Sequence, residues 1–206
     1  MASVAHEFVY DVFLSFRGED TRYGFTGNLK NALNDKGIKT FMDDDELQKG
    51  DEITPSLLQA IEDSKIAIVV LSKSYASSSF CLQELSKIID SMKDKADRSI
   101  LPIFYKVDPS DVRKLKKSYG EAMDKHEASS SSHDLDRWKA SLQQVANLSG
   151  FHYKKGYVPY YPISFGFSLV YLINSKNAVF CTVPTLYLDN TDELGYIKGL
   201  DKFDEF

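Results

Sequence analysis

The chain has 206 residues, of which 43% are hydrophobic and 27% charged, a composition typical of a globular domain with a real core. Its formal net charge of −5 argues against a protein whose main task is to coat nucleic acid. Only two cysteines occur, Cys81 and Cys181, so we expect no disulfide framework and a reducing compartment. Because the N-terminus lacks the basic and apolar stretches of a signal peptide, we expect a cytoplasmic location, with a nuclear one left open.

The first predicted strand covers residues 11–16, an apolar run that is typical of a parallel strand covered on both faces. It ends abruptly in a charged segment with a glycine, Arg17-Gly18-Glu19-Asp20-Thr21-Arg22. In open α/β sheets, ligands bind beside the loops at the carboxyl ends of the strands. We therefore expect residues 17–22 to form a loop that faces a ligand.

Strands and helices are predicted to alternate along the following residues, as in βαβ units that build a parallel sheet. Helical spacing predicts a helix over residues 25–33, and Thr54-Pro55 is typical of a helix cap followed by the first helical position. Right-handed crossovers would place the loops 17–22, 43–52 and 72–80 at one edge of the sheet. The further predicted strands are 38–42, 66–71, 100–105 and 151–153, the further helices are 81–92, 119–127 and 135–148, and a turn is predicted at 108–111.

The character of the chain changes after residue 157. Residues 156–175 are uncharged and contain two prolines, and residues 189–206 are acidic and mixed. We expect one domain over residues 8–157 and a divergent, partly disordered tail over 158–206. The uncharged run is about long enough to span a membrane, but its prolines and hydroxyl groups argue against a membrane segment.

Several phrases resemble the plant-type TIR domain in order and spacing, over residues 8–157. The phrase at residues 10–22, YDVFLSFRGEDTR, is long enough to be specific, and the others are found at residues 36–38, 47–53, 72–85, 103–113 and 146–150. The resemblance implies a flavodoxin-like α/β fold of three layers with a parallel sheet of about five strands.

The resemblance also implies a function. TIR domains signal by self-association in innate immunity, and many plant members cleave NAD⁺ or NADP⁺ at the bond between nicotinamide and ribose, giving ADP-ribose or a cyclic variant. The dinucleotide would be the substrate, no metal or further cofactor is implied, and the expected partners are other TIR domains rather than nucleic acid. Glu84 lies at the family's catalytic position, and the residues implied to contact the dinucleotide are Arg17, Gly18, Glu19, Asp20, Thr21, Arg22, Gly50 and Phe80.

The chemistry of this reaction suits a carboxylate. Nicotinamide leaves NAD⁺ as a neutral group, so the transition state needs stabilisation of the positive charge that develops on the ribose. On a helical wheel Glu84 lies about 100° from Leu85, which predicts a position at the rim of the apolar stripe, facing the ligand edge. Phe80 would stack on a flat ring, and Arg17 and Arg22 would bind the pyrophosphate.

Structural interpretations of the same residues stay open. Glu84 is also favoured near a helix start by the helix dipole alone. Arg17 and Arg22 would then pair with Glu19 and Asp20 in a solvated loop, and Gly18 and Gly50 would be turn glycines. For Cys81 we expect a core position rather than a nucleophile, for Trp138 a core position, and for residues 43–46 a solvated acidic loop rather than a metal site.

Three departures from the family pattern leave a second function open. Position 80 is Phe where most plant members carry Trp, and Gly27-Asn28 replaces a common Ser-His pair on one self-association surface. The family's last helix should follow residue 157, but Pro159 and Pro162 do not fit a regular helix, so we expect it to be missing or replaced. The alternatives to the enzyme are a non-catalytic TIR adaptor or decoy, or a truncated and poorly folded product.

Overall fold

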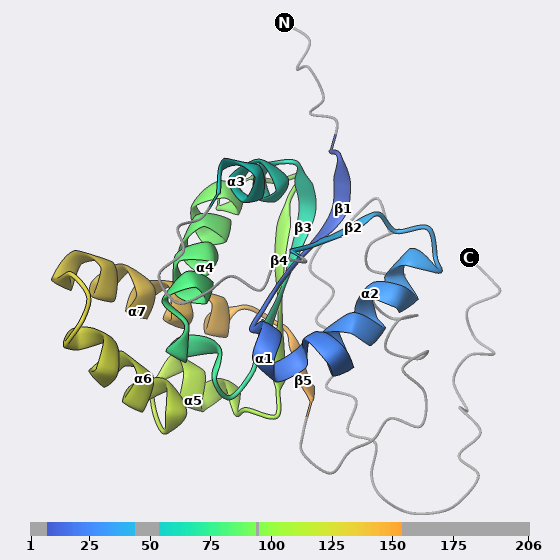
Figure 1. Cartoon of the computed structure of the whole chain (residues 1–206). Coiled ribbons are helices and arrows are strands. Elements are labelled where there is room, and N and C mark those ends of the chain that lie inside the picture. Colours follow the sequence, from blue (N-terminus) through green and yellow to red (C-terminus); the bar gives the residue numbers. More distant parts are fainter. Residues whose placement is uncertain (1–7, 44–53, 94, 154–206) are drawn as a thin grey trace, which may run out of the picture.

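The structure is a computed structural model that describes residues 8–43, 54–93 and 95–153. These residues form a five-stranded sheet in the order β2-β1-β3-β4-β5 (Figure 1). Every neighbouring pair of strands is parallel, which confirms the predicted α/β sheet. The strands are β1 (Tyr10–Phe16), β2 (Thr40–Met42), β3 (Ser64–Leu71), β4 (Ser99–Tyr105) and β5 (Phe151–Tyr153).

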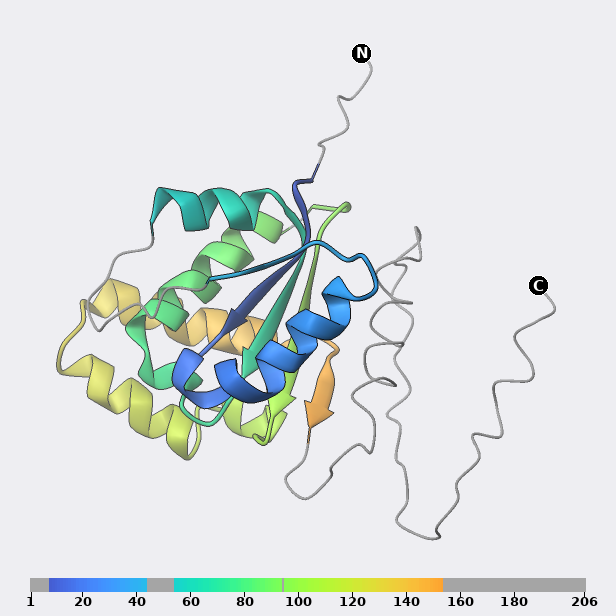
Figure 2. The same ribbon diagram turned by 45° about the vertical axis from the view of Figure 1, so that its right-hand side comes forward.

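Helices cover both faces of this sheet, so the described residues form the expected flavodoxin-like arrangement of three layers. Helix α2 lies on one face, and α3, α4 and α7 lie on the other (Figures 1 and 2). The helical segments are α1 (Gly18–Thr21), the π-helix η1 (Arg22–Thr26), α2 (Gly27–Asn34), α3 (Pro55–Glu62), the 3₁₀ turn η2 (Tyr75–Ser77), α4 (Ser79–Met92), α5 (Pro109–Arg113), α6 (Ser118–Glu127) and α7 (Ser132–Asn147).

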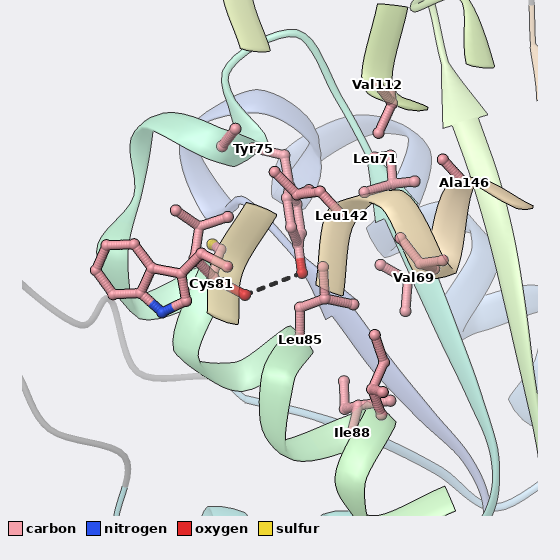
Figure 3. Packing of buried hydrophobic residues seen from close by; sticks show 14 of the residues in the cluster. Val69, Leu71, Tyr75, Cys81, Leu85, Ile88, Val112, Leu142 and Ala146 are labelled. Atoms are coloured by element: carbon pink, nitrogen blue, oxygen red, sulfur yellow. Dashed lines mark hydrogen bonds between the residues drawn. The ribbon is translucent and has the colours of Figure 1, made fainter. Parts of the chain in front are cut away.

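The core consists of two clusters, one on each face of the sheet. Strand β3 lies in the middle of the sheet and contributes to both, since successive side chains point to opposite faces. Val69 and Leu71 pack among the helices α4 and α7 (Figure 3), whereas Ile68 and Val70 pack on the side of α2. Burial on both faces explains why the sequence of β3 is almost purely aliphatic. Trp138 is buried in the first cluster, as predicted.

Local signals placed several helices correctly. Thr54 Oγ1 accepts a hydrogen bond from Leu57 N at 3.2 Å, and Pro55 takes the first helical position of α3. Ser78 caps α4 in the same way, and the predicted apolar stripe of this helix is buried.

The predicted turn at 108–111 is wrong: Asp108 accepts from Ser110 N at 2.7 Å and caps the short helix α5.

The predicted loop at residues 17–22 is also wrong, because this segment is helical. Helix α1 begins directly after Arg17 and continues through η1 into α2. The Asp20 N–H donates to the Arg17 carbonyl oxygen at 3.1 Å, so the chain turns as soon as β1 ends. Glu19 and Asp20 occupy the first turn, where negative charge is favoured by the exposed N–H groups. The charged residues still follow the carboxyl end of β1.

Several predictions lie outside the described residues: Gly50, the acidic loop after residue 43, the domain boundary after residue 157 with its divergent tail, and the replacement of the family's last helix. Within residues 8–43, 54–93 and 95–153, we find no helix that combines the length and the apolar character needed to cross a membrane.

Candidate functional site

Glu84 lies on α4, four residues after Phe80, so the two side chains share one face of the helix. The Glu84 side chain is only 4% exposed, and the expectation of a position at the open rim is therefore wrong. Helix α4 packs against β1 and against the helices α3 and α7, so residues beside the apolar stripe are enclosed as well. A helical wheel shows which face a residue occupies, but it does not show how far the neighbouring elements extend over that face.

Burial changes the charge of this carboxyl group. Desolvation raises the pKa of Glu84 from 4.5 to about 8, a hydrogen bond with Ser15 lowers it, and the nearby Asp43 raises it further. At neutral pH the carboxyl is therefore protonated in this arrangement. Ser15 is the second-last residue of β1 and Asp43 directly follows β2, so Glu84 lies behind the carboxyl edge of the sheet.

A buried group of hydroxyls adjoins Glu84, and sequence reasoning missed it. The hydroxyls of Ser15 and Tyr75 lie 2.9 Å apart, and Tyr75 also donates to the Cys81 carbonyl oxygen at 3.1 Å (Figure 3). Both side chains are fully buried. A signal was present, since Ser15 is a polar residue inside the otherwise apolar, buried half of β1.

Arg17 and Asp20 join α1 to the segment after β3. Arg17 Nη1 donates to Ser77 Oγ at 2.7 Å, and Arg17 Nη2 donates to Glu19. The Asp20 carboxylate accepts from Ser72 Oγ at 2.6 Å and from Ser74 N at 2.9 Å. Arg17 thus pairs with Glu19 and lies 3.8 Å from Asp20, as the structural interpretation predicted.

The remaining predicted contact residues lie on or beside the same edge. Arg22 Nη1 donates to the Asp43 carbonyl oxygen at 2.7 Å, and its guanidinium lies over the Phe16 ring. Thr21 is buried and accepts a hydrogen bond from Thr26, which makes it a structural residue. Phe80 is half-buried against the core. A Cβ at position 18 would lie 3.2 Å from Arg22 Nε, so Gly18 leaves room for that side chain.

Cys81 is not a nucleophile in this arrangement. Burial raises the pKa of its thiol from 9.0 to about 12, so the reactive thiolate does not form near neutral pH. The thiol donates to the Phe16 carbonyl oxygen at 3.7 Å. The prediction of a core cysteine is confirmed.

Comparison with known proteins identifies the family. The family model of the TIR domain matches residues 9–158. The chain belongs to the TIR domain family. The disease resistance protein RUN1 of Vitis rotundifolia is 48% identical over 157 residues, which is 75% of this chain and 12% of that protein. The TMV resistance protein N of Nicotiana glutinosa is 48% identical over 151 residues, 72% of this chain and 13% of that protein.

A solved structure is similar over the same region. The TIR domains in the activated Roq1 resistosome, which directly recognises the pathogen effector XopQ, match with 46% identity and a TM-score of 0.66, over 79% of this chain and 97% of that chain. The match thus covers nearly all of the Roq1 TIR chain but only about an eighth of the two resistance proteins.

Asp20 offers a test of how this TIR domain holds its carboxyl edge together. Asp20→Ala leaves the Ser72 hydroxyl and the Ser74 N–H without their acceptor, and we expect the free energy of unfolding to fall by about 1–3 kcal/mol. Urea denaturation measures the change. Asp124→Ala, on the exposed side of α6, is the control and should change stability by less than about 0.5 kcal/mol. Equal effects of the two substitutions would contradict the role given to Asp20.

Proposed function

We propose that this TIR domain is an NAD⁺ or NADP⁺ nucleosidase of plant innate immune signalling, which releases nicotinamide and ADP-ribose or a cyclic variant. The observation that carries the proposal is the position of the Glu84 carboxyl, buried behind the carboxyl edge of the sheet, with Phe80 one helical turn before it. Identities near 48% to plant disease resistance proteins support the immune context. The dinucleotide is substrate, the reaction needs no metal, and we place it in the cytoplasm.

The buried carboxyl suits a reaction that develops positive charge. The substrate brings a cationic nicotinamide-ribose beside Glu84, and a nearby positive charge favours the ionised form of a carboxyl group. When the site opens, the neutral acid of the closed arrangement releases its proton to solvent, and the resulting carboxylate stabilises the oxocarbenium-like ribose. Because little water surrounds the group, this attraction is stronger than at an exposed site.

The groups after β1 supply the anion contacts in this proposal. Arg17, whose side chain is 20% exposed, holds Glu19, whose side chain is 78% exposed, so Glu19 has room to turn into solvent when another anion takes its place. A pyrophosphate oxygen would therefore replace the Glu19 carboxylate. Gly18, Arg22 and Gly50 complete the proposed dinucleotide contacts, and Phe80 stacks on a ring of the substrate.

Substrate reaches Glu84 only when the residues around it move, since the side chain is 4% exposed. We assign this opening to self-association with further TIR domains. The similarity to TIR domains of an activated resistosome supports that assignment.

Nicotinamide release by the purified full-length chain tests the function. We expect the rate per molecule to rise with protein concentration, because assembly opens the site and association follows mass action. Molecular weight by light scattering at each concentration shows whether the assembled fraction rises in parallel. No release of nicotinamide at concentrations where the chain is assembled would refute the enzyme.

The closed state of Glu84 favours a second candidate, a non-catalytic adaptor or decoy that binds other TIR domains. In that case the chain would form mixed assemblies with a plant TIR domain and release no nicotinamide, alone or in the mixture.

A further inference from the structure

Two buried side chains of α6, Tyr119 and His126, hold the segment that follows β3. We propose that they are positioning residues: they fix residues 72–77, and this segment in turn orients the Arg17 guanidinium toward the anionic part of the substrate. The inference rests on the proposed function for the identity of that substrate, but the hydrogen bonds themselves are independent of it.

Helix α6 holds the segment near both of its ends. The Tyr119 hydroxyl donates to the Ser72 carbonyl oxygen at 2.8 Å. His126 Nε2 lies 3.0 Å from the Ala76 carbonyl oxygen, and because a carbonyl oxygen only accepts, Nε2 carries the proton and donates it. The His126 ring meets the Trp138 ring nearly edge-on, with 5.2 Å between the centroids, so packing keeps the imidazole in place.

The hydrogen bond from His126 also fixes the position of Ser77. The Ala76 carbonyl and the Ser77 N–H belong to one planar peptide unit, so holding the oxygen holds the backbone at Ser77. The Ser77 hydroxyl donates to the Ser74 carbonyl oxygen at 2.7 Å, which uses its single proton. Toward Arg17 the same hydroxyl therefore accepts, from Nη1 at 2.7 Å.

Arg17 receives its direction from this segment. Its Nη1 donates to Ser77 Oγ and, at 3.3 Å, to the Ser74 carbonyl oxygen. Because the guanidinium is planar, fixing Nη1 also fixes the direction of Nη2, which holds Glu19 and would bind the pyrophosphate in the proposed function. A cation that is already oriented binds an anion at a smaller cost in conformational entropy. Asp20 of α1 also holds the segment, so α1 and α6 support it together.

The first experiment measures KM and kcat of nicotinamide release by the full chain, at a concentration where it is assembled. His126→Leu removes the donor, and we expect KM to rise about fivefold while kcat changes by less than about twofold, because Arg17 meets the pyrophosphate and not the bond that breaks. His126→Gln supplies an amide N–H to the same oxygen and should bring KM back toward the wild-type value. Tyr119→Phe keeps the ring, removes only the hydroxyl, and should raise KM in the same way.

A double-mutant cycle separates positioning from a general loss of stability. If His126 acts through Ser77, His126→Leu should raise KM by less than about twofold on a Ser77→Ala background, where the bond to Arg17 is already gone. Ser141→Ala is the matched control, since it removes a buried hydroxyl that lies 2.9 Å from the Ser86 hydroxyl, outside the segment. We expect the wild-type KM in this variant. Additive effects in the cycle would overturn the proposal.

The second experiment needs no turnover. Nitrogen NMR of the Arg17 guanidinium follows rotation about its Nε–Cζ bond, which is slow while Nη1 is held. We expect this rotation to be about fivefold faster in His126→Leu and in Tyr119→Phe, and unchanged in Ser141→Ala. If His126→Leu does not fold, Tyr119→Phe decides.

The two measurements keep the two proposals apart. Faster rotation in a chain that releases no nicotinamide refutes the enzyme and supports the positioning of Arg17 by α6. An unchanged rotation rate in the folded variants of Tyr119 and His126 overturns the positioning role, whether or not the chain cleaves NAD⁺.

Discussion

We expect Glu84→Gln to lower the rate of nicotinamide release by roughly 100-fold or more, because the amide cannot become the anion that stabilises the developing ribose cation. Gln has nearly the same shape as the protonated Glu present in the closed arrangement, so the fold should be kept. The rate is measured at a protein concentration where the wild-type chain is assembled and active.

Glu127→Gln is the matched control for this substitution. It makes the same chemical change at an exposed position of α6, outside the proposed dinucleotide contacts. We expect this variant to release nicotinamide at the wild-type rate. If Glu84→Gln keeps full activity while it assembles normally, Glu84 is not the catalytic residue.

The stability of the wild-type chain should fall as the pH rises from about 4.5 to about 8, the pKa values of Glu84 in the unfolded and folded chain. Between these values the folded chain keeps a proton that the unfolded chain has released, so the free energy of unfolding falls by about 1.4 kcal/mol per pH unit from this group. This stabilising contribution of Glu84 is complete below pH 4.5 and is lost once the pH passes about 8. Ending the titration below the thiol's usual pKa of 9.0 keeps Cys81 out of the comparison.

Glu84→Gln removes the titrating group, so its stability should depend less on pH, and the variant should be more stable than wild type near pH 8. Urea denaturation at several pH values measures both proteins. Parallel pH dependences in the two proteins would show that Glu84 does not carry the raised pKa.

Parts of the fold with local causes could be predicted from the sequence. The strand at residues 151–153 has the predicted bounds, and the start of α3 follows from Thr54 and Pro55. The apolar stripe of α4 follows from helical spacing alone. The local structure of the segment after β1 was harder to predict, because its charged residues suit a solvated loop and a helical turn equally well. The bonds of Asp20 to Ser72 and Ser74, more than fifty positions away, join this helical turn to the segment after β3.

Residue types at short spacing were enough to predict the alternation of strands and helices, the family resemblance and the candidate Glu84. The enclosure of Glu84, with Ser15 and Tyr75 next to it, could not be predicted and is seen only in the packed fold. Ser15 and Tyr75 are 60 positions apart and meet because β1 pairs with β3, which leads into η2. Burial depends on such long-range packing, and burial is the main cause of the raised pKa of the carboxyl group on which the proposed chemistry depends.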